Sequence, residues 1–345
     1  MMRTVAAFAP GRVNLIGDHT DYTGGWALPI AVEWGTTVEV RAGGARVELT
    51  SADATGAAVV GLDVADPSSV EPAWARYVAG VVAVLRPAEG AVGTVSTTLP
   101  VGAGLSSSAA LEVAVALALG FDGEPRELAL ACQRAEHLAS GVPSGVMDQL
   151  ASVGGVAGHA LLIDCTSLDV TPVAMPANVD VVVVHSGQAR ALAGSRYAAR
   201  RAECEAAVRV MGPLREASST DLHKLEGVLQ RRARHVITEN RRVLDFAACL
   251  RVGDLADAGR LMRASHASLA EDFEVSTPAL DALVEELSAA PGVYGARLTG
   301  AGFGGCVVAL ADPSSPVRGW RLHASAGAAV GVPGRSRSEV GVAGR

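Results

Sequence analysis

The sequence predicts an α+β fold with two lobes, and three observations support this prediction. A length of 345 residues suffices for one large domain or two ordinary domains with buried cores. Short β-rich segments dominate the first part of the chain, whereas helical patterns dominate the second half, which closes on another pair of strands. Because strands and helices do not alternate regularly, the order favours α+β over a doubly wound parallel sheet.

The first lobe is predicted to combine a sheet with several helices. β-branched and aromatic residues indicate strands at 4–9, 26–32, 36–41 and 45–50, with Gly43 and Gly44 as a hairpin turn between the last two. Apolar, alanine-rich patterns predict helices at 74–85, 107–119 and 125–140, the third opening with Pro125. A short helix is predicted at 147–152, followed by strands at 160–164 and 170–173.

The second lobe is predicted to be mainly helical. A strand at 179–185 precedes helices at 196–211, 225–250, 255–269 and 278–289, and a β-pair lies near 295–298 and 306–311. We place the lobes at residues 1–175 and 176–330. Residues 331–345 are rich in Gly, Ser and Arg and are predicted to be disordered.

Composition excludes several classes of protein. The formal charge of −7 and the 4% of aromatic residues argue against nucleic acid as a partner. Lys224 is the only lysine and fits neither a Walker A loop nor a protein-kinase strand. No apolar run has the length of a membrane span or a secretory signal, and the five cysteines form no CxxC pair. We therefore expect a cytoplasmic protein without a membrane partner.

The strongest local motif runs from Pro100 to Ala110, between a strand-like segment and an apolar helix. Glycines allow backbone N–H groups to turn toward a ligand, and a helix N-terminus favours an anion, so this motif can hold phosphate without a lysine. A serine-capped helix after a glycine turn is the simpler alternative. The motif contains more donors than a cap needs, which favours phosphate.

A second motif runs from Ala9 to Tyr22. Its residues Asp18, His19 and Asp21 supply acceptors and a switchable donor suited to the hydroxyls of a polyol. A metal site is the alternative, but no second His/Cys cluster stands at ligand spacing. Segments 141–149 and 298–306 are weaker signals: the first places an aspartate at a helix start, and the second is a glycine-rich loop that suits either phosphate or a tight turn.

Taken together, in this order and spacing, the motifs resemble the galactokinase branch of the GHMP small-molecule kinase family. The resemblance extends from Ala9 to about Ala311, and the segment 11–22 is its most specific part. It implies a ribosomal-protein-S5-like N-terminal lobe, a ferredoxin-like C-terminal lobe and a site between them. The implied reaction transfers the γ-phosphoryl group of ATP to the anomeric hydroxyl of galactose.

The resemblance also implies roles for individual residues. ATP phosphates are expected at Gly102, Ala103, Gly104, Leu105, Ser106, Ser107 and Ser108, with Ser108 and Glu136 as Mg²⁺ ligands. Asp148 is expected beside the sugar C1 hydroxyl, paired with Arg12, either as a general base or as an orienting group. The implied sugar-binding set is Arg12, Asp18, His19, Thr20, Asp21, Asp148 and Tyr197.

Two departures from the family pattern leave the sugar open. Position 18 is Asp where Glu is usual, and position 144 is Ser where Cys is common. A shorter carboxylate must reach its hydroxyl differently, so an amino sugar or arabinose stands behind galactose. A non-catalytic sugar- and ATP-binding regulator is disfavoured by the intact run Ser108–Ala110 and by Asp148, and a mevalonate- or homoserine-type kinase by segment 18–21. The oligomeric state is left open, and a monomer is compatible with the sequence.

Overall fold

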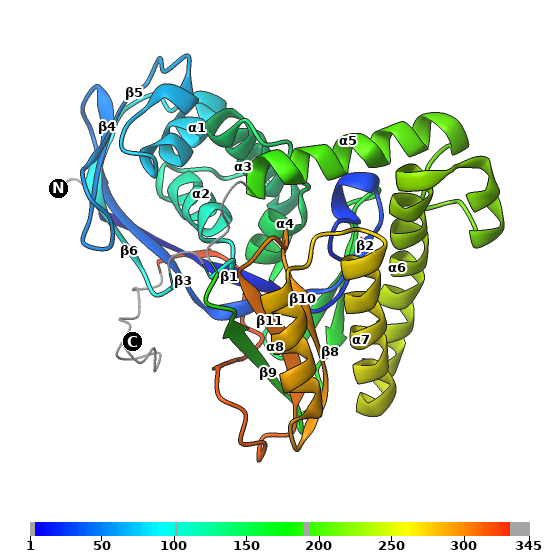
Figure 1. The fold of residues 1–345 in the computed structure, drawn as a ribbon. Helices are drawn as coiled ribbons and strands as arrows, with labels where there is room; N and C mark the ends of the chain where they lie inside the picture. The colour runs from blue at the N-terminus through cyan, green and yellow to red at the C-terminus, as the bar shows by residue number, and fades with distance from the viewer. Residues whose placement is uncertain (1–3, 101–102, 189–192, 332–345) are drawn as a thin grey trace.

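The computed structural model describes residues 4–100, 103–188 and 193–331, with the backbone alone for 193–195. Figure 1 shows a large sheet carrying helices on one face, joined to smaller sheets with longer helices around them. The predicted α+β order is confirmed. Residues 101–102 and 332–345 lie outside the described residues, so the expectations for Gly102 and for a disordered tail are not addressed by the structure.

The helices of the first half follow the prediction, whereas the strands predicted at 26–32 and 36–41 form mainly one long strand and an additional strand lies at Ala58–Gly61. The strands are β1 (Thr4–Asn14), β2 (Trp26–Ala27), β3 (Pro29–Ala42), β4 (Arg46–Ser51), β5 (Ala58–Gly61), β6 (Ala91–Thr97), β7 (His159–Asp164) and β8 (Val170–Ala174). The helices are α1 (Ala75–Leu85), α2 (Ser107–Ala118), α3 (Pro125–Ser140) and α4 (Met147–Gly154). Strand β1 is longer than predicted and carries Arg12 and Asn14 of the second motif within the sheet.

The second half is mainly helical. Its helices are α5 (Ala193–Met211), α6 (Gly227–Val252), α7 (Leu255–Glu271) and α8 (Pro278–Ala289). Its strands are β9 (Asp180–His185), β10 (Val293–Thr299), β11 (Cys306–Ala311), β12 (Trp320–Leu322) and β13 (Ala329–Val330). Strands β12 and β13, like β5 of the first half, have no counterpart in the prediction.

The hairpin predicted at Gly43 and Gly44 is wrong. The six-stranded sheet has the order β13-β1-β3-β6-β4-β5, so β6 lies between β3 and β4, antiparallel to the first and parallel to the second. Both glycines do turn the chain, with φ of 134° and 90°, and the Gly43 N–H donates to the Gly90 carbonyl (2.8 Å). Local turn chemistry allows the chain to reverse but does not say which strand becomes the neighbour.

Helix α3 illustrates how local sequence sets an element's limits. Pro125 stands at its first turn, and the Glu124 and Glu127 side chains form a capping box with each other's backbone N–H groups. Gly141 ends the helix in the left-handed region, at φ 68°. These local signals account for the agreement between the predicted and observed bounds of this helix.

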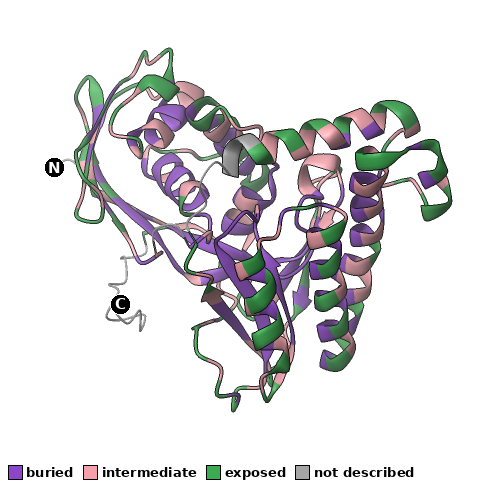
Figure 2. Cartoon of the chain, in the orientation of Figure 1, coloured by how far each residue is buried: buried purple, intermediate pink, exposed green. Residues whose placement is uncertain are grey.

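A shared core joins the two halves of the chain. One buried cluster brings Val13 and Leu28 of the first half against Val183, Phe246 and Val308 of the second. Figure 2 shows buried residues continuous through the sheets beneath the outer helices. Strand β13 pairs with β1, which returns the chain's last described strand to the first sheet. The lobe boundary at residue 175 stays a prediction.

The smaller sheets complete the scaffold. One has the order β10-β11-β9-β12 and the other β2-β7-β8. All five cysteines are free. Within the described ranges, no helix combines the length and the apolar character needed to cross a bilayer.

Candidate active site

Arg12 of β1 and Asp148 of α4 form the centre of the candidate site. Arg12 Nε donates to Asp148 Oδ1 (2.7 Å) and Nη2 donates to Oδ2 (2.6 Å), while Nη1 donates to the carbonyl of Gly104 (2.9 Å). The Ser106 hydroxyl donates to Asp148 Oδ2 as well. A two-point contact between a guanidinium and a carboxylate sets both the distance and the plane of the carboxylate.

The segment that leads into α2 lies against β1. Arg12 N–H donates to the Leu105 carbonyl (3.1 Å), and a Cβ on Gly11 would lie 2.4 Å from the same oxygen. Gly104 has φ 72°, and Ser106, a non-glycine residue, has φ 56° and ψ 51°. This left-handed conformation directs the Ser106 hydroxyl to Asp148 instead of to the N–H groups of the helix. The helix N-terminus therefore begins directly beside the ion pair.

A second polar cluster surrounds Glu136 of α3. Ser108 Oγ donates to Glu136 Oε1 (3.1 Å), while Ser144 Oγ (2.8 Å) and Gln149 Nε2 (2.9 Å) donate to Oε2. Position 144, one of the two departures noted in the sequence, thus contacts the predicted metal ligand directly.

Ser108 and Glu136 fit Mg²⁺ by donor type, because a hydroxyl and a carboxylate oxygen are hard oxygen ligands. Among the described residues, no group of three or more His, Cys, Asp or Glu side chains could hold a metal ion. Mg²⁺ at nucleotide sites commonly takes one or two protein oxygens and completes its shell with phosphates and water. This pair, with Ser108 at the start of α2 and Glu136 on α3, suits such sharing.

The loop predicted to bind the sugar, residues 15–25, follows β1 and is called the sugar loop below. Gly17 has φ 92° and His19 has φ 65°, so the chain turns sharply there before the short 3₁₀ helix Asp21–Thr23. The Thr20 hydroxyl lies 2.8 Å and 2.7 Å from the carbonyl oxygens of Gly17 and Trp26. Thr20 therefore ties together the two ends of the loop.

Asp18 lies beneath this loop and is 2% exposed. Its Oδ2 accepts from Arg297 Nη2 (2.6 Å) and its Oδ1 from the N–H of Gly300 (3.0 Å). The glycine-rich loop after β10, for which phosphate was one expectation, is thus in contact with the sugar loop. Both carboxylate oxygens of Asp18 therefore have hydrogen-bond partners within the protein.

His19 lies between the two loops. Its Nδ1 is 3.0 Å from the Tyr22 hydroxyl and its Nε2 is 3.2 Å from the Ala301 carbonyl. Burial, together with the nearby His235, lowers the pKa of His19 to about 3. His19 is therefore neutral near pH 7 and offers one donor and one acceptor.

Asp21 lies against Gly145, close enough to Asp148 to interact with its charge. A Cβ on Gly145 would lie 1.8 Å from Asp21 Oδ2, so this approach requires glycine at position 145. Burial, and next the charge of Asp148, raise the pKa of Asp21 to about 7. The Tyr197 ring lies 5.4 Å from His19 and 5.3 Å from Tyr22 between centroids. The structure thus brings Asp21, His19 and Tyr197 together near Asp148.

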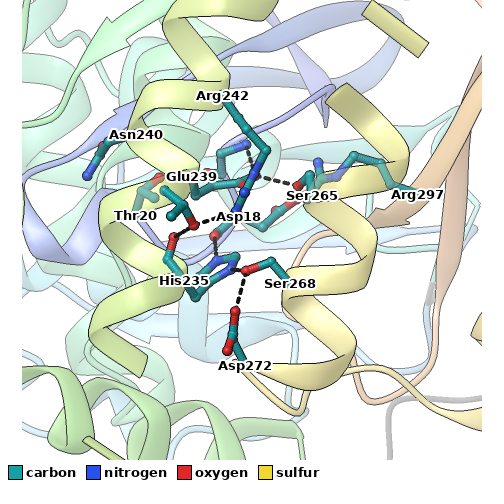
Figure 3. Close-up of polar contacts among 12 residues, drawn as sticks. Asp18, Thr20, His235, Glu239, Asn240, Arg242, Ser265, Ser268, Asp272 and Arg297 are labelled. Atoms are coloured by element: carbon teal, nitrogen blue, oxygen red, sulfur yellow. Dashed lines mark hydrogen bonds and ion pairs between the residues drawn. The ribbon is translucent and has the colours of Figure 1, made fainter. Parts of the chain in front are cut away.

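Behind the loop lies a buried polar network that the sequence reading missed (Figure 3). Glu239 Oε1 accepts from the N–H of Gly17 (3.0 Å) and from Ser265 Oγ (2.5 Å), and Oε2 accepts from Arg242 Nε (2.7 Å). Burial would raise the pKa of Glu239, but nearby positive groups, Arg242 first among them, lower it to about 2. The signal in the sequence that could have revealed this network was Glu239, a charged residue among the buried positions of α6.

Comparisons with known proteins agree with this geometry. Three family models match in order: the galactokinase galactose-binding signature over residues 2–42, the GHMP kinases N-terminal domain over 76–156 and the GHMP kinases C-terminal domain over 246–321. A galactokinase from Roseiflexus sp. (strain RS-1) is 48% identical over 329 residues, covering 89% of this chain and 83% of the relative. The galactokinase from Homo sapiens is 44% identical over 333 residues, covering 90% and 84%.

Solved structures give the same picture. The galactokinase of Lactococcus lactis complexed with galactose has a TM-score of 0.87 and 32% identity, with 95% of each chain covered. The mevalonate kinase of Methanococcus jannaschii has a TM-score of 0.62 at 19% identity, with 90% of this chain and 91% of the other covered. The second likeness concerns the fold alone.

Proposed function

The chain belongs to the galactokinase family of GHMP kinases, and from this premise we propose that the protein transfers the γ-phosphoryl group of ATP to the anomeric hydroxyl of galactose. The observation that carries the proposal is the Arg12–Asp148 ion pair, which lies between the N-terminus of α2 and the sugar loop. The products are galactose 1-phosphate and ADP.

We propose that segment 102–108 binds the phosphates of ATP. The N-terminus of α2 places positive potential there, and Arg12 supports the segment by donating to the Gly104 carbonyl. Lys224 forms an ion pair with Asp221 (2.8 Å) between α5 and α6, and no lysine is needed at the phosphates.

Ser108 and Glu136 would hold Mg²⁺ in this proposal. When bound, Mg²⁺ neutralises phosphate charge and orients the γ-phosphoryl group for in-line transfer. Glu136 already faces the Ser108 hydroxyl, and its second oxygen is held by Ser144 and Gln149. The donor types and the place at the start of α2 support this assignment.

For the chemical step, we propose that Asp148 interacts with the anomeric hydroxyl and either accepts its proton or orients it. The sugar oxygen attacks the γ-phosphorus, the bond between that phosphorus and the β–γ bridging oxygen breaks, and ADP leaves with that oxygen. The sugar proton passes to Asp148, or Asp148 orients the hydroxyl until the proton leaves to water. Arg12 and Ser106 keep the carboxylate in one orientation, which supplies the positioning that phosphoryl transfer requires.

For sugar recognition, we propose direct contacts from Asp21 and Tyr197, which lie beside Asp148. His19, also expected to bind the sugar, is 4% exposed and both of its ring nitrogens have partners within the protein, so we propose that it acts by packing its ring against Tyr197. Asp18 and Thr20, also expected to bind the sugar, have partners within the protein, so we assign them to the shape of the loop. Arg12 contributes through Asp148. The five free cysteines support a reducing compartment, and we propose that the protein is cytoplasmic.

One experiment separates this proposal from its alternatives. ADP release is measured with galactose, galactosamine, arabinose, mevalonate and homoserine, each with ATP and Mg²⁺. Galactose is expected to give the highest kcat/KM. Higher activity on arabinose or galactosamine would reassign the sugar, and binding of ATP and galactose without turnover would identify a regulator.

A further inference from the structure

Helix α2 contains a carboxyl group that the proposed reaction does not use. Glu112 is 0% exposed and lies in sequence between Leu111 and Val113 on a helix that is buried on most sides. A carboxyl group is rarely buried without a polar partner, because desolvation is costly. The partner here is Gln149 of α4, also 0% exposed, whose Nε2 donates to Glu112 Oε2 (3.3 Å).

Gln149 connects this buried carboxyl group to the predicted metal site. The same Nε2 atom donates to Glu136 Oε2 (2.9 Å), so both N–H bonds of the amide are used, one toward α2 and one toward α3. Gln149 also directly follows Asp148 on α4. The Gln149 side chain thus connects Glu136, a proposed metal ligand, to α4, the helix that carries Asp148.

We propose that Gln149, anchored by Glu112, is a positioning residue that holds the carboxylate of Glu136 with Oε1 toward Ser108. The inference rests on the proposed role of Glu136 and Ser108 as Mg²⁺ ligands and deepens it. Gln149 and Ser144 both donate to Oε2, which leaves Oε1, the oxygen beside Ser108, for an ion. Partners of this kind change metal affinity by roughly 10- to 100-fold when they are removed.

The anchor needs an acceptor oxygen at position 112 and does not need a charge. Within the described residues, Glu112 Oε1 and Gln149 Oε1 have no hydrogen-bond partner. Burial, and next the charge of Glu136, raise the pKa of Glu112 well above its ordinary value. The other titratable groups around it are Tyr77 of α1, Cys132 of α3 and Asp148 of α4. A protonated carboxyl group has the hydrogen-bonding pattern of an amide, so glutamine is its matched replacement.

The test compares Gln149→Met and Glu112→Met with Glu112→Gln. ADP affinity is measured by calorimetry with excess Mg²⁺ and with EDTA, and kcat and the KM for galactose are measured against Mg²⁺ concentration. Gln149→Met is expected to raise the Mg²⁺ concentration for half-saturation roughly 10-fold or more. ADP affinity in EDTA and the KM for galactose are expected to stay unchanged.

The Glu112 variants test the anchor separately. Glu112→Met is expected to match Gln149→Met, whereas Glu112→Gln retains the acceptor and is expected to keep the Mg²⁺ dependence of the original protein. The Mg²⁺ concentration for half-saturation of the double variant is expected to be no higher than that of either Met variant, because both substitutions remove the same hydrogen bond between Gln149 and Glu112. Unfolding curves establish that each variant folds. If Gln149→Met does not fold, the comparison of Glu112→Met with Glu112→Gln tests the positioning role instead.

A reference variant distinguishes failure of this inference from failure of the proposed site. If Glu136→Gln leaves the Mg²⁺ dependence unchanged, the assignment of the metal ligands is wrong. If Glu136→Gln shifts it and folded Gln149→Met does not, the positioning role is overturned. If Glu112→Gln changes the Mg²⁺ dependence as much as Glu112→Met does, the proposal that Glu112 anchors Gln149 without a charge is overturned.

Discussion

Arg12 and Asp148, 136 positions apart in the chain, meet in a two-point ion pair in which Arg12 Nε and Nη2 each donate to a different oxygen of the carboxylate. Arg12 is itself held by the Gly104 carbonyl at the start of the phosphate segment (2.9 Å). The orientation of Asp148 is therefore linked to the placement of that segment, and a change at any of these points is expected to affect transfer more than sugar binding.

Replacing Asp148 with asparagine tests its role in the chemical step. Asn keeps the shape of the side chain but removes the basic carboxylate, so Asp148→Asn is expected to lower kcat by at least about 10²-fold. Galactose binding, measured by calorimetry, is expected to persist. Retention of a near-normal rate by the folded variant would remove Asp148 from the mechanism.

Ser106 allows a test of the orientation of Asp148 that leaves the carboxylate in place. Glycine adopts φ 56° without strain, so Ser106→Gly removes the hydroxyl and preserves the turn. A hydrogen bond to a charged group contributes about 1.5–3 kcal/mol, so kcat is expected to fall by roughly 10-fold or more. Galactose binding, measured by calorimetry, is the control, and ADP affinity is measured beside it. A variant that loses ADP affinity but keeps kcat would place Ser106 in nucleotide binding alone.

The buried pair of Asp18 and Arg297 predicts a coupled effect on stability. Arg297 is 0% exposed and bonds both Asp18 (2.6 Å) and the Leu15 carbonyl (3.0 Å). Arg297→Met leaves a buried carboxylate without its cation, which is expected to cost about 3–5 kcal/mol in the free energy of unfolding. Adding Asp18→Asn is expected to recover part of this loss in urea denaturation. Losses that simply add would contradict the coupling.

The raised pKa of Asp21 predicts a pH dependence. With a pKa of about 7 in the free protein, Asp21 becomes ionised, and a stronger acceptor for sugar hydroxyls, as the pH rises through 7. kcat/KM for galactose is therefore expected to increase across that range, and Asp21→Asn is expected to flatten the profile. An unchanged midpoint in the variant would assign the titration to another group.

The same shift has a definite sign for stability. Between the ordinary value of 3.8 and about 7, folded Asp21 keeps a proton that the unfolded chain releases. Asp21 therefore contributes stability that is present below pH 3.8 and is lost as the pH rises through 7. The free energy of unfolding of Asp21→Asn, measured from pH 4 to pH 7, is expected to lack this decline.

Lys224, the only lysine, is expected to be dispensable. It pairs with Asp221 (2.8 Å) at the surface, where an ion pair contributes about 0–1 kcal/mol. Lys224→Ala is therefore expected to leave kcat and the KM for ATP unchanged. A large drop in rate would mean that the phosphate site has been placed wrongly.

Helix bounds could be predicted because their signals are local. Pro125 and Gly141 mark the ends of α3 in the sequence as they do in the structure. The neighbour of β4 could not be predicted, because β6 enters the sheet from about forty residues further along the chain and turn chemistry at Gly43 and Gly44 is indifferent to it.

The same division applies to the site. The phosphate motif stands out by residue type, whereas Arg12 and Asp148 were expected only through the family resemblance of the motifs that contain them. Glu239, Arg297 and Glu112 were missed, because a charged residue in an apolar pattern shows its purpose only when its partner is known. Those partners are Gly17, Asp18 and Gln149, each distant in sequence.

By itself, the sequence determined the family and the α+β class, and it predicted most of the helices, because motifs and periodicity are carried by neighbouring residues. Only the tertiary structure decided which polar residues of the site contact one another. Asp18 bonds to the buried Arg297, whereas Asp21 lies against Gly145 and within reach of the charge of Asp148. The physical reason is that burial and charge pairing are set by segments that meet only in the folded chain.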